Sequence, residues 1–262
     1  MGYLTASVLY IANLFVRSTR PAVLATLVSC AAVLAHTVGL FQITMQTGRS
    51  PYSTVYGSVG FVAWLIVLMQ LVLVWRWRMY ATGAFSLPIA GLMLLFALAL
   101  PPEMRQLLPD LRRQSLAAHI SVILLGYGAF AVAFGLSLIY LMEERLLKAR
   151  RLQGLFERLP PLRVTESVAF GFAAFGQAML TLGLAIGLVW AQEMWTKRLW
   201  QDPKVIPSLV TWGVYSVYLL LRGVSGWRGR PAAWLLVVGF CAVLVTLVGV
   251  NALFPGRHGL PY

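Results

Sequence analysis

The sequence is poor in charged residues and in cysteine. Only 11% of its 262 residues are charged, whereas 60% are hydrophobic, and this composition leaves too little polar surface for a soluble domain. The two cysteines, Cys30 and Cys241, stand alone, so the chain has no Cys-x-x-Cys pair for a thiol relay or a covalent attachment site. It also contains no phosphate-binding loop, dinucleotide fingerprint, nucleophile elbow or zinc motif. These absences exclude most classes of soluble enzyme.

Apolar stretches of the length that a helix needs to cross a ~30 Å hydrocarbon core recur along the whole chain. Because lipid cannot satisfy open backbone groups and the alternation of barrel strands is absent, these stretches are predicted to be helices. The sequence therefore predicts an all-α, polytopic membrane protein with about eight transmembrane helices, forming one integral-membrane domain over residues 1–262. The expected spans are 3–16, 22–45, 57–75, 82–100, 116–142, 168–194, 206–221 and 232–254.

Lysine and arginine are distributed unevenly between the two sides of this arrangement. Thirteen of the 21 basic residues fall in loops on one side, and such residues favour the cytoplasm. Both termini are therefore expected outside, and residues 143–167 are expected to form an inner basic loop with a break at Pro160 and Pro161. The net charge of +13 suits anchoring at anionic membrane lipid. No nucleic acid is expected as a partner.

Histidine is scarce, and two of the three histidines fall on the same predicted side. His119 opens the fifth span at its outer end, and His258 follows the last span. A fold that joins these spans could offer two imidazoles to a heme iron. Six outer cations could neutralise an anionic ligand such as the two heme propionates, although ordinary solvated loop charge is the alternative. They are Arg112, Arg113, Lys197, Arg198, Lys204 and Arg257.

Tryptophan residues cluster at the end of the sixth span and just after it in the sequence, where residues 195–207 are predicted to form an outer Trp-rich segment. The run from Trp190 to Lys204 reads W-A-Q-E-M-W-T-K-R-L-W-Q-D-P-K, and an aromatic belt at the interface is one explanation. The run also resembles the WWD segment of the heme-handling family that includes CcsA/ResC, CcmC and CcmF. The CcsA form is approximately W-A-x-E-x-W-G-x-Y-W-x-W-D-P-K-E-x-W. Without a gap, the matches are Trp190, Glu193, Trp195, Asp202, Pro203 and Lys204.

The chain departs from this pattern at several places. Thr196 replaces a glycine, and Leu199 and Gln201 replace two tryptophans, with Trp200 one position away. On a helix, one position is a turn of about 100°, so Trp200 can compensate only within a loop. CcsA proteins usually place another histidine near the inner side of the seventh span, where this chain has Leu220.

The resemblance covers roughly residues 25–260. Residues 48–58 resemble the G-x-x-P-x-S-N-x-Y-E-S segment of CcsA, with Thr54 and Gly57 in place of the Asn and Glu. Residues 118–121 resemble the L-H-V-S segment that carries the first outer heme-ligating histidine. Residues 226–230 match the inner G-W-x-G-R turn, and residues 249–251, which lead to His258, resemble the segment before the second outer histidine.

The resemblance implies a set of heme-binding residues. His119 and His258 would be the axial ligands of heme b, and the outer cations would face its propionates. The heme edge would rest on Trp190, Trp195, Trp200 and Asp202. His36 resembles an intramembrane histidine of HemX/YpjD-like relatives, and it is either a further heme ligand or a structural residue in a helix-to-helix hydrogen bond.

The implied function is that of a membrane subunit of a system II-type cytochrome c synthase, a heme lyase component if active. It would present heme on the outer side of a bacterial inner membrane or a thylakoid membrane for attachment to an apocytochrome c CxxCH motif. A ResB/CcsB-like membrane subunit would be its partner. The alternative is a non-catalytic, HemX/YpjD-like scaffold or regulatory subunit. A small-solute transporter finds little support, because no related pair of broken helices is apparent.

Overall fold

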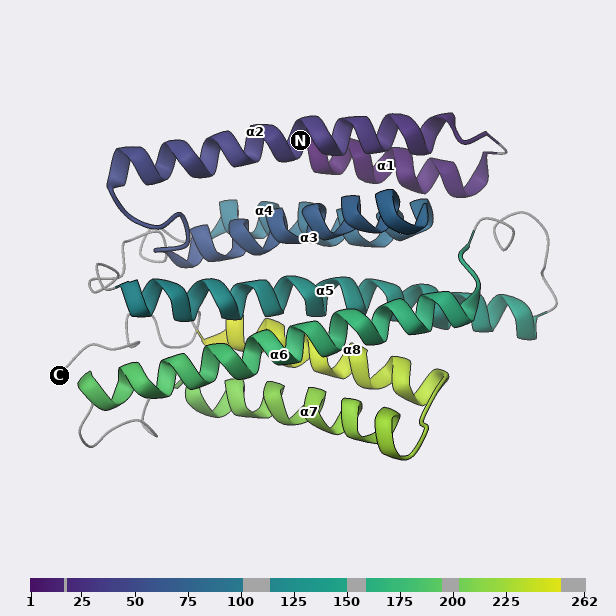
Figure 1. Ribbon diagram of the computed structural model, residues 1–262. Helices are drawn as coiled ribbons and strands as arrows, with labels where there is room; N and C mark the ends of the chain where they lie inside the picture. The colour runs from purple at the N-terminus through teal and green to yellow at the C-terminus, as the bar shows by residue number, and fades with distance from the viewer. Residues whose placement is uncertain (17, 101–113, 150–158, 195–202, 251–262) are drawn as a thin grey trace.

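The computed structural model describes residues 1–16, 18–100, 114–149, 159–194 and 203–250, and these residues form helices without any strand (Figure 1). The 3₁₀ turn η1 (Tyr80–Thr82) precedes α4, and the π-helical turn η5 (Val245–Gly249) extends α8. Each of the eight predicted spans corresponds to one helix, so the predicted fold class is confirmed. The helices are α1 (Gly2–Phe15), α2 (Arg20–Thr47), α3 (Val55–Trp77), α4 (Gly83–Ala99), α5 (Gln114–Lys148), α6 (Leu162–Met194), α7 (Val205–Val224) and α8 (Arg230–Leu244).

The helices differ in how far they reach. Seven apolar helical spans among the described residues are long enough to cross a membrane, whereas α1 has 14 residues and a length of ~21 Å at 1.5 Å per residue. The Tyr10 hydroxyl on α1 is 2.9 Å from that of Thr26 on α2, and Gly2 lies against Ala32. α1 thus covers one part of the length of α2. The 143–167 segment is partly helical, because α5 continues to Lys148 and α6 begins after Pro161.

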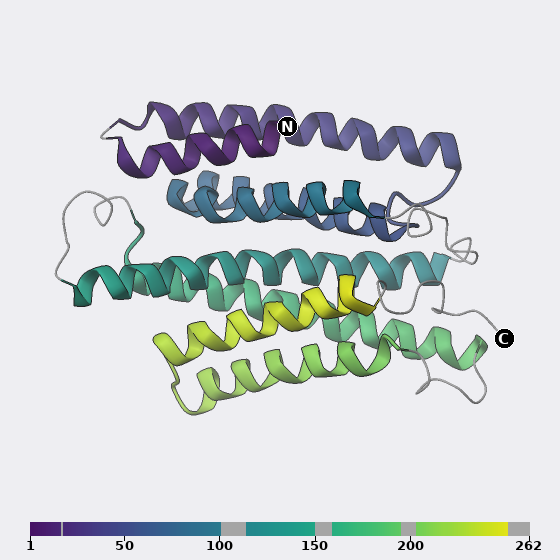
Figure 2. The same ribbon diagram turned by 180° about the vertical axis from the view of Figure 1, so that it is seen from behind.

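The eight helices form layers around α5. The pairs α1–α2 and α3–α4 lie on one side of α5, and α7 and α8 lie on the other (Figure 1). Seen from behind, α8 lies nearer the viewer than α6 (Figure 2), and both helices pack against α5. The covered part of α5 contains small and apolar side chains such as Ala129, Phe130 and Val132, all with no exposed area. α2 and α7 lie at the rim and expose apolar side chains, as expected of helices that face lipid.

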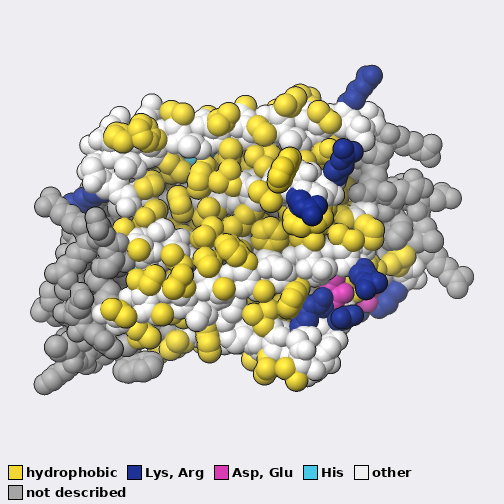
Figure 3. Space-filling view, in the orientation of Figure 1, with side chains coloured by type: hydrophobic (Ala, Val, Ile, Leu, Met, Phe, Trp, Pro, Cys, Tyr) yellow, Lys and Arg dark blue, Asp and Glu magenta, His cyan; other side chains and the backbone are white. Residues whose placement is uncertain are grey.

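The bundle has two chemically different ends. At one, which we call the Glu166 end, α1, α3, α5 and α7 finish and the next helix begins (Figure 1). At the other, the His119 end, α3, α5 and α7 begin. Apolar side chains cover the flank between the ends, and the described charged side chains in this view gather mainly at the Glu166 end (Figure 3). This distribution is the one expected of a membrane-spanning bundle with a basic side.

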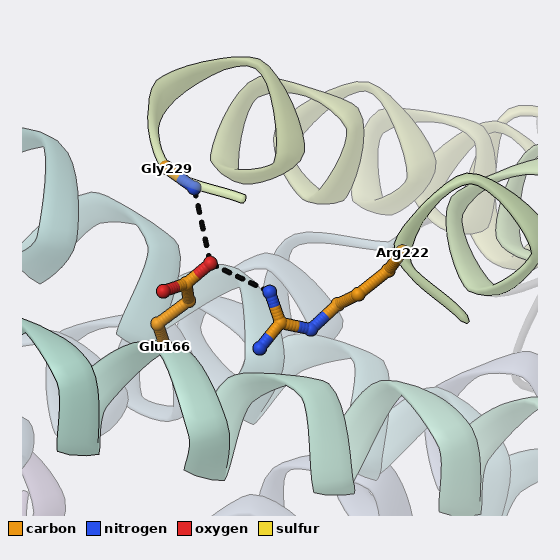
Figure 4. Close-up of polar contacts among 3 residues, drawn as sticks. All are labelled: Glu166, Arg222 and Gly229. Atoms are coloured by element: carbon orange, nitrogen blue, oxygen red, sulfur yellow. Dashed lines mark hydrogen bonds and ion pairs between the residues drawn. The ribbon is translucent and has the colours of Figure 1, made fainter. Parts of the chain in front are cut away.

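At the Glu166 end, a glutamate carboxylate accepts two hydrogen bonds from neighbouring segments. Oε1 of Glu166 on α6 accepts a 2.6 Å bond from the Arg222 guanidinium on α7 and a 3.0 Å bond from the Gly229 backbone N–H (Figure 4). Gly226 and Gly229 have φ of +64° and +78°, a left-handed conformation that glycine adopts at little cost. The glycines of the G-W-x-G-R turn thus let the chain reverse direction, and Glu166 fastens the turn to α6.

Candidate functional site

His119 lies in the first turns of α5, against α6. Its Nδ1 atom is 2.7 Å from the backbone carbonyl oxygen of Gly183. The ring also rests on Gly187, one turn further along α6, where a Cβ atom would overlap His119 Cε1 and lie 2.7 Å from Nδ1. The histidine is therefore held by the backbone of the neighbouring helix at the His119 end.

A row of glycines allows α5 and α6 to approach this closely. Gly176, Gly183 and Gly187 are spaced seven and four residues apart, which places them on one face of α6. A Cβ at Gly176 would be 2.6 Å from the Phe130 ring on α5, and one at Gly183 would overlap Ile123 Cγ1. Small residues are the usual means by which transmembrane helices bring their backbones together. The contact of His119 with α6 depends on this approach.

The loop before α3 is tied to the helix that carries His119. The Tyr52 hydroxyl donates a 3.2 Å hydrogen bond to the carbonyl of Ala117, which also accepts a 2.6 Å bond from the Ser121 hydroxyl. Thr54 caps α3 by accepting a 2.8 Å bond from the Gly57 N–H. Two segments that carry the family resemblance, residues 48–58 and 118–121, therefore meet in space at the start of α5.

Buried hydroxyl groups connect α5, α7 and α8 just below the His119 end. The hydroxyls of Thr211 on α7 and Thr246 in η5 are 3.1 Å apart, and Tyr127 on α5 reaches Ser208 and Thr246. All four side chains are buried, and buried polar groups of this kind need partners. The cluster links the helix of His119 to the π-helical turn, after which the chain continues towards residue 258.

The structure brings three of the predicted site residues to one end of the bundle. His119, the backbone of Trp190 near the end of α6, and Lys204 at the N-cap of α7 all lie there. Trp190 follows Gly187 by three residues, a rise of ~4.5 Å along the helix. The Trp-rich run thus starts about one turn beyond the place where His119 touches α6. The other predicted residues of this site lie outside the described part of the chain, namely His258, Trp195, Trp200, Asp202, Arg112, Arg113, Lys197, Arg198 and Arg257.

His36 is not part of this arrangement. It lies on α2, whose main neighbours are α1 and α3, and its Nδ1 atom is 3.0 Å from the hydroxyl of Tyr3 on α1. The two rings are tilted against each other with centroids 5.8 Å apart. The helix-to-helix hydrogen bond expected of a structural histidine is therefore present.

The structure shows the surroundings of two residues at which the chain departs from the family pattern. Leu220, which stands where CcsA proteins usually have a histidine, is 61% exposed on the outer face of α7. A Cβ at Gly57, which stands where the pattern has Glu, would overlap the carbonyl oxygen of Pro51. The turn before α3 therefore requires glycine at position 57 in this chain.

Sequence reasoning missed the residues that hold His119 and the turn before α8. Gly183 and Gly187 were not singled out, although their spacing with Gly176 is a detectable signal of close helix packing. The pairing of Glu166 with Arg222 joins residues 56 positions apart, and no local sequence pattern predicts it. The functional segments were recognisable, but their supports were not.

The family model described as "Cytochrome C assembly protein" matches residues 52–258, and the chain belongs to this family. Its place is therefore in cytochrome c biogenesis, in a membrane.

Curated relatives agree over most of the chain. A protein of Synechococcus sp. (strain CC9902) named cytochrome c biogenesis protein CcsA is 33% identical over 266 residues, covering 92% of this chain and 87% of the relative. The protein of the same name from Guillardia theta is 29% identical and covers 89% and 83%. That from Prochlorococcus marinus (strain NATL2A) is 32% identical and covers 81% and 77%. The similarity thus extends well beyond the Trp-rich run.

Proposed function

We propose that the chain holds heme b at the His119 end and presents it for attachment to apocytochrome c. The observation that carries this proposal is the position of His119, packed on α6 about one turn before Trp190. The hydroxyl cluster below links the same helix to the turn that leads towards His258. His119 and His258 would bind the iron from opposite sides, and the Trp-rich segment would support the edge of the ring.

In this function the protein contributes position and access more than acid–base chemistry. Each thiol of an apocytochrome CxxCH motif adds across one vinyl group of a reduced heme: the sulfur bonds to carbon, the proton goes to the neighbouring carbon, and nothing leaves. The histidine of the motif then replaces one of the two protein imidazoles. The six predicted outer cations, of which Lys204 is in the described part, would face the propionates.

The basic side of the bundle supports an orientation for this site. The Glu166 end carries Arg76, Arg78, Arg145, Arg163 and Arg222, and such residues favour the cytoplasm. The His119 end would therefore face the periplasm or the thylakoid lumen, and both termini would lie outside. A membrane subunit resembling ResB/CcsB would work beside it, as the resemblance to CcsA implies.

The three histidines allow a matched test of heme binding. The purified protein is expected to show the Soret band of a heme with two imidazole ligands. His119→Ala and His258→Ala should each lower bound heme, and added imidazole should restore it. His36→Leu is the control, because it removes an imidazole from a different part of the bundle and should leave the band in place.

A second candidate function, a HemX/YpjD-like scaffold without catalysis, is favoured by the exposed Leu220 and by Leu199 and Gln201 in the Trp-rich run. If the purified protein contains no heme, or if His119→Ala and His258→Ala leave the bound heme unchanged, the result supports the scaffold. If heme binds, coexpression with a CxxCH reporter and a ResB-like subunit separates attachment from storage. Covalent heme on the reporter, lost with His119→Ala, is the result expected of a synthase.

A further inference from the structure

Gly183 and Gly187 form a notch in α6, here called the glycine notch, in which the His119 ring lies. The Gly183 carbonyl is 2.7 Å from Nδ1, and Gly187 lies under the Cε1 edge of the ring. The two glycines are four residues apart, so they follow one another on the same face of α6. The notch therefore offers one hydrogen-bond acceptor and a flat space beside it.

We propose that the glycine notch fixes His119 with its proton on Nδ1 and makes Nε2 the iron-binding nitrogen. A carbonyl oxygen only accepts hydrogen bonds, so Nδ1 must donate in this contact. In the neutral ring the lone pair is then on Nε2. The tautomer follows from the contact alone, whereas the role of Nε2 towards iron rests on the proposed function.

The hydrogen bond to Gly183 would orient the His119 ring, as comparable hydrogen bonds do at metal sites in general. Histidines that bind metals almost always donate their other N–H to a carbonyl or carboxylate, which orients the ring and raises the basicity of the ligating nitrogen. Gly183 and Gly187 are therefore positioning residues, because they act through His119. Loss of such a partner typically weakens metal binding about 10- to 100-fold.

Gly187 is the position at which this idea can be separated from ordinary helix packing. Gly176 lies on the same face of α6, and a Cβ there would meet the Phe130 ring and not the histidine. It is eleven residues from Gly187, or ~16 Å along the helix. Gly187→Ala should push the imidazole away from the Gly183 carbonyl, whereas Gly176→Ala should strain the same interface without moving it.

The first experiment needs no heme. The apoprotein is labelled with ¹⁵N-histidine, and its three histidine signals are assigned with His36→Leu and His119→Ala. His119 is expected as the tautomer protonated at Nδ1, and Gly187→Ala should shift its signal towards a mixture of tautomers while Gly176→Ala should not. A wild-type His119 protonated at Nε2, or a signal that Gly187→Ala leaves unchanged, would overturn the proposal.

The second experiment measures heme retention. Gly187→Ala is expected to weaken it by about 10-fold or more, with Gly176→Ala close to wild type. If His119→Ala abolishes binding and Gly187→Ala has no effect, this inference is wrong while the proposed function stands. If neither variant matters, the proposed function fails, and the tautomer result still decides whether the notch fixes the ring.

A variant that keeps both glycines covers the case in which Gly187→Ala does not fold. His119→Gly leaves space for a free ligand next to the Gly183 carbonyl. Imidazole has an N–H to donate to that carbonyl, and 1-methylimidazole has none. Imidazole should restore heme binding at least several-fold better. Equal rescue by the two ligands would show that the Gly183 carbonyl does not orient the ligand.

Discussion

The two ends of the bundle are fastened by different chemistry. At the Glu166 end, charged groups are paired: Arg222 with Glu166 at 2.6 Å, and Lys148 with Glu144 at 2.7 Å. At the His119 end, the hydrogen bonds between segments described above use neutral partners. These are the Gly183 carbonyl, the Ala117 carbonyl and the hydroxyl cluster.

The proposed function accounts for this difference. A membrane-spanning bundle needs a fixed orientation, and a basic rim with a few paired acids supplies it on one side. A histidine that binds metal needs a neutral imidazole and a fixed tautomer, which a backbone carbonyl supplies without an added charge. Under the proposed function, the Glu166 end would therefore serve stability and orientation, and the His119 end would hold the imidazole in one position.

The largest expected effect lies at the Glu166 end. Glu166→Ala leaves the Arg222 guanidinium and the Gly229 N–H without their common acceptor, and the two charged side chains are only 18% and 12% exposed. Removing one partner of such a pair is expected to cost about 3 kcal/mol. Denaturant unfolding in mixed micelles measures it. Glu166→Gln, which keeps an acceptor for Gly229, should lose less, and an equal loss would mean that the charge carries the whole effect.

Tyr52→Phe tests the tie between the two family segments at the His119 end. It removes the hydroxyl that donates to the Ala117 carbonyl and keeps the ring that packs on Phe61, with centroids 5.2 Å apart. The expected loss of stability is about 1 kcal/mol. Hydrogen exchange should rise in the first turns of α5 and not at the Glu166 end. Uniformly faster exchange would contradict the separation of the two ends.

The hydroxyl pair Thr211 and Thr246 is expected to contribute less. Each hydroxyl also bonds to a carbonyl of its own helix, at Pro207 and Ala242 respectively, so only the contact between helices is at stake. A double-mutant cycle with Thr211→Val and Thr246→Val should give a coupling of about 0.6 kcal/mol, as is typical inside membranes. A coupling of zero would mean that packing alone holds α7 to η5.

The smallest effect is expected at the exposed pair of Lys148 and Glu144. The Lys148 side chain is 65% exposed, and the two residues are four apart on α5, so Glu144→Gln should cost about 0.3–0.5 kcal/mol. Because such pairs are screened, the difference should vanish in high salt. A loss as large as that of Glu166→Ala would remove the distinction drawn between a largely buried pair and a surface pair.

The sequence by itself determined the class of the protein and the order of its helices. Apolar length and scarce charge are sufficient, because a segment of about 20 apolar residues has few alternatives to a membrane helix. The predicted span 168–194, for example, lies within α6, although the helix begins earlier, at Leu162. The helix begins there because proline is tolerated before a helix or in its first turn but not in its interior, and Pro160 and Pro161 stand directly before Leu162. Hydropathy marks only the apolar part of the helix.

Only the tertiary structure decided which of these residues meet. The spacing of Gly183 and Gly187 indicates a face for close packing, but they become supports of His119 only because α5 and α6 pack with those faces together. Glu166 and Arg222, likewise, are joined by the return of α7 alongside α6. Contacts between distant segments depend on the packing of whole helices, and a local pattern carries no information about which faces will pair.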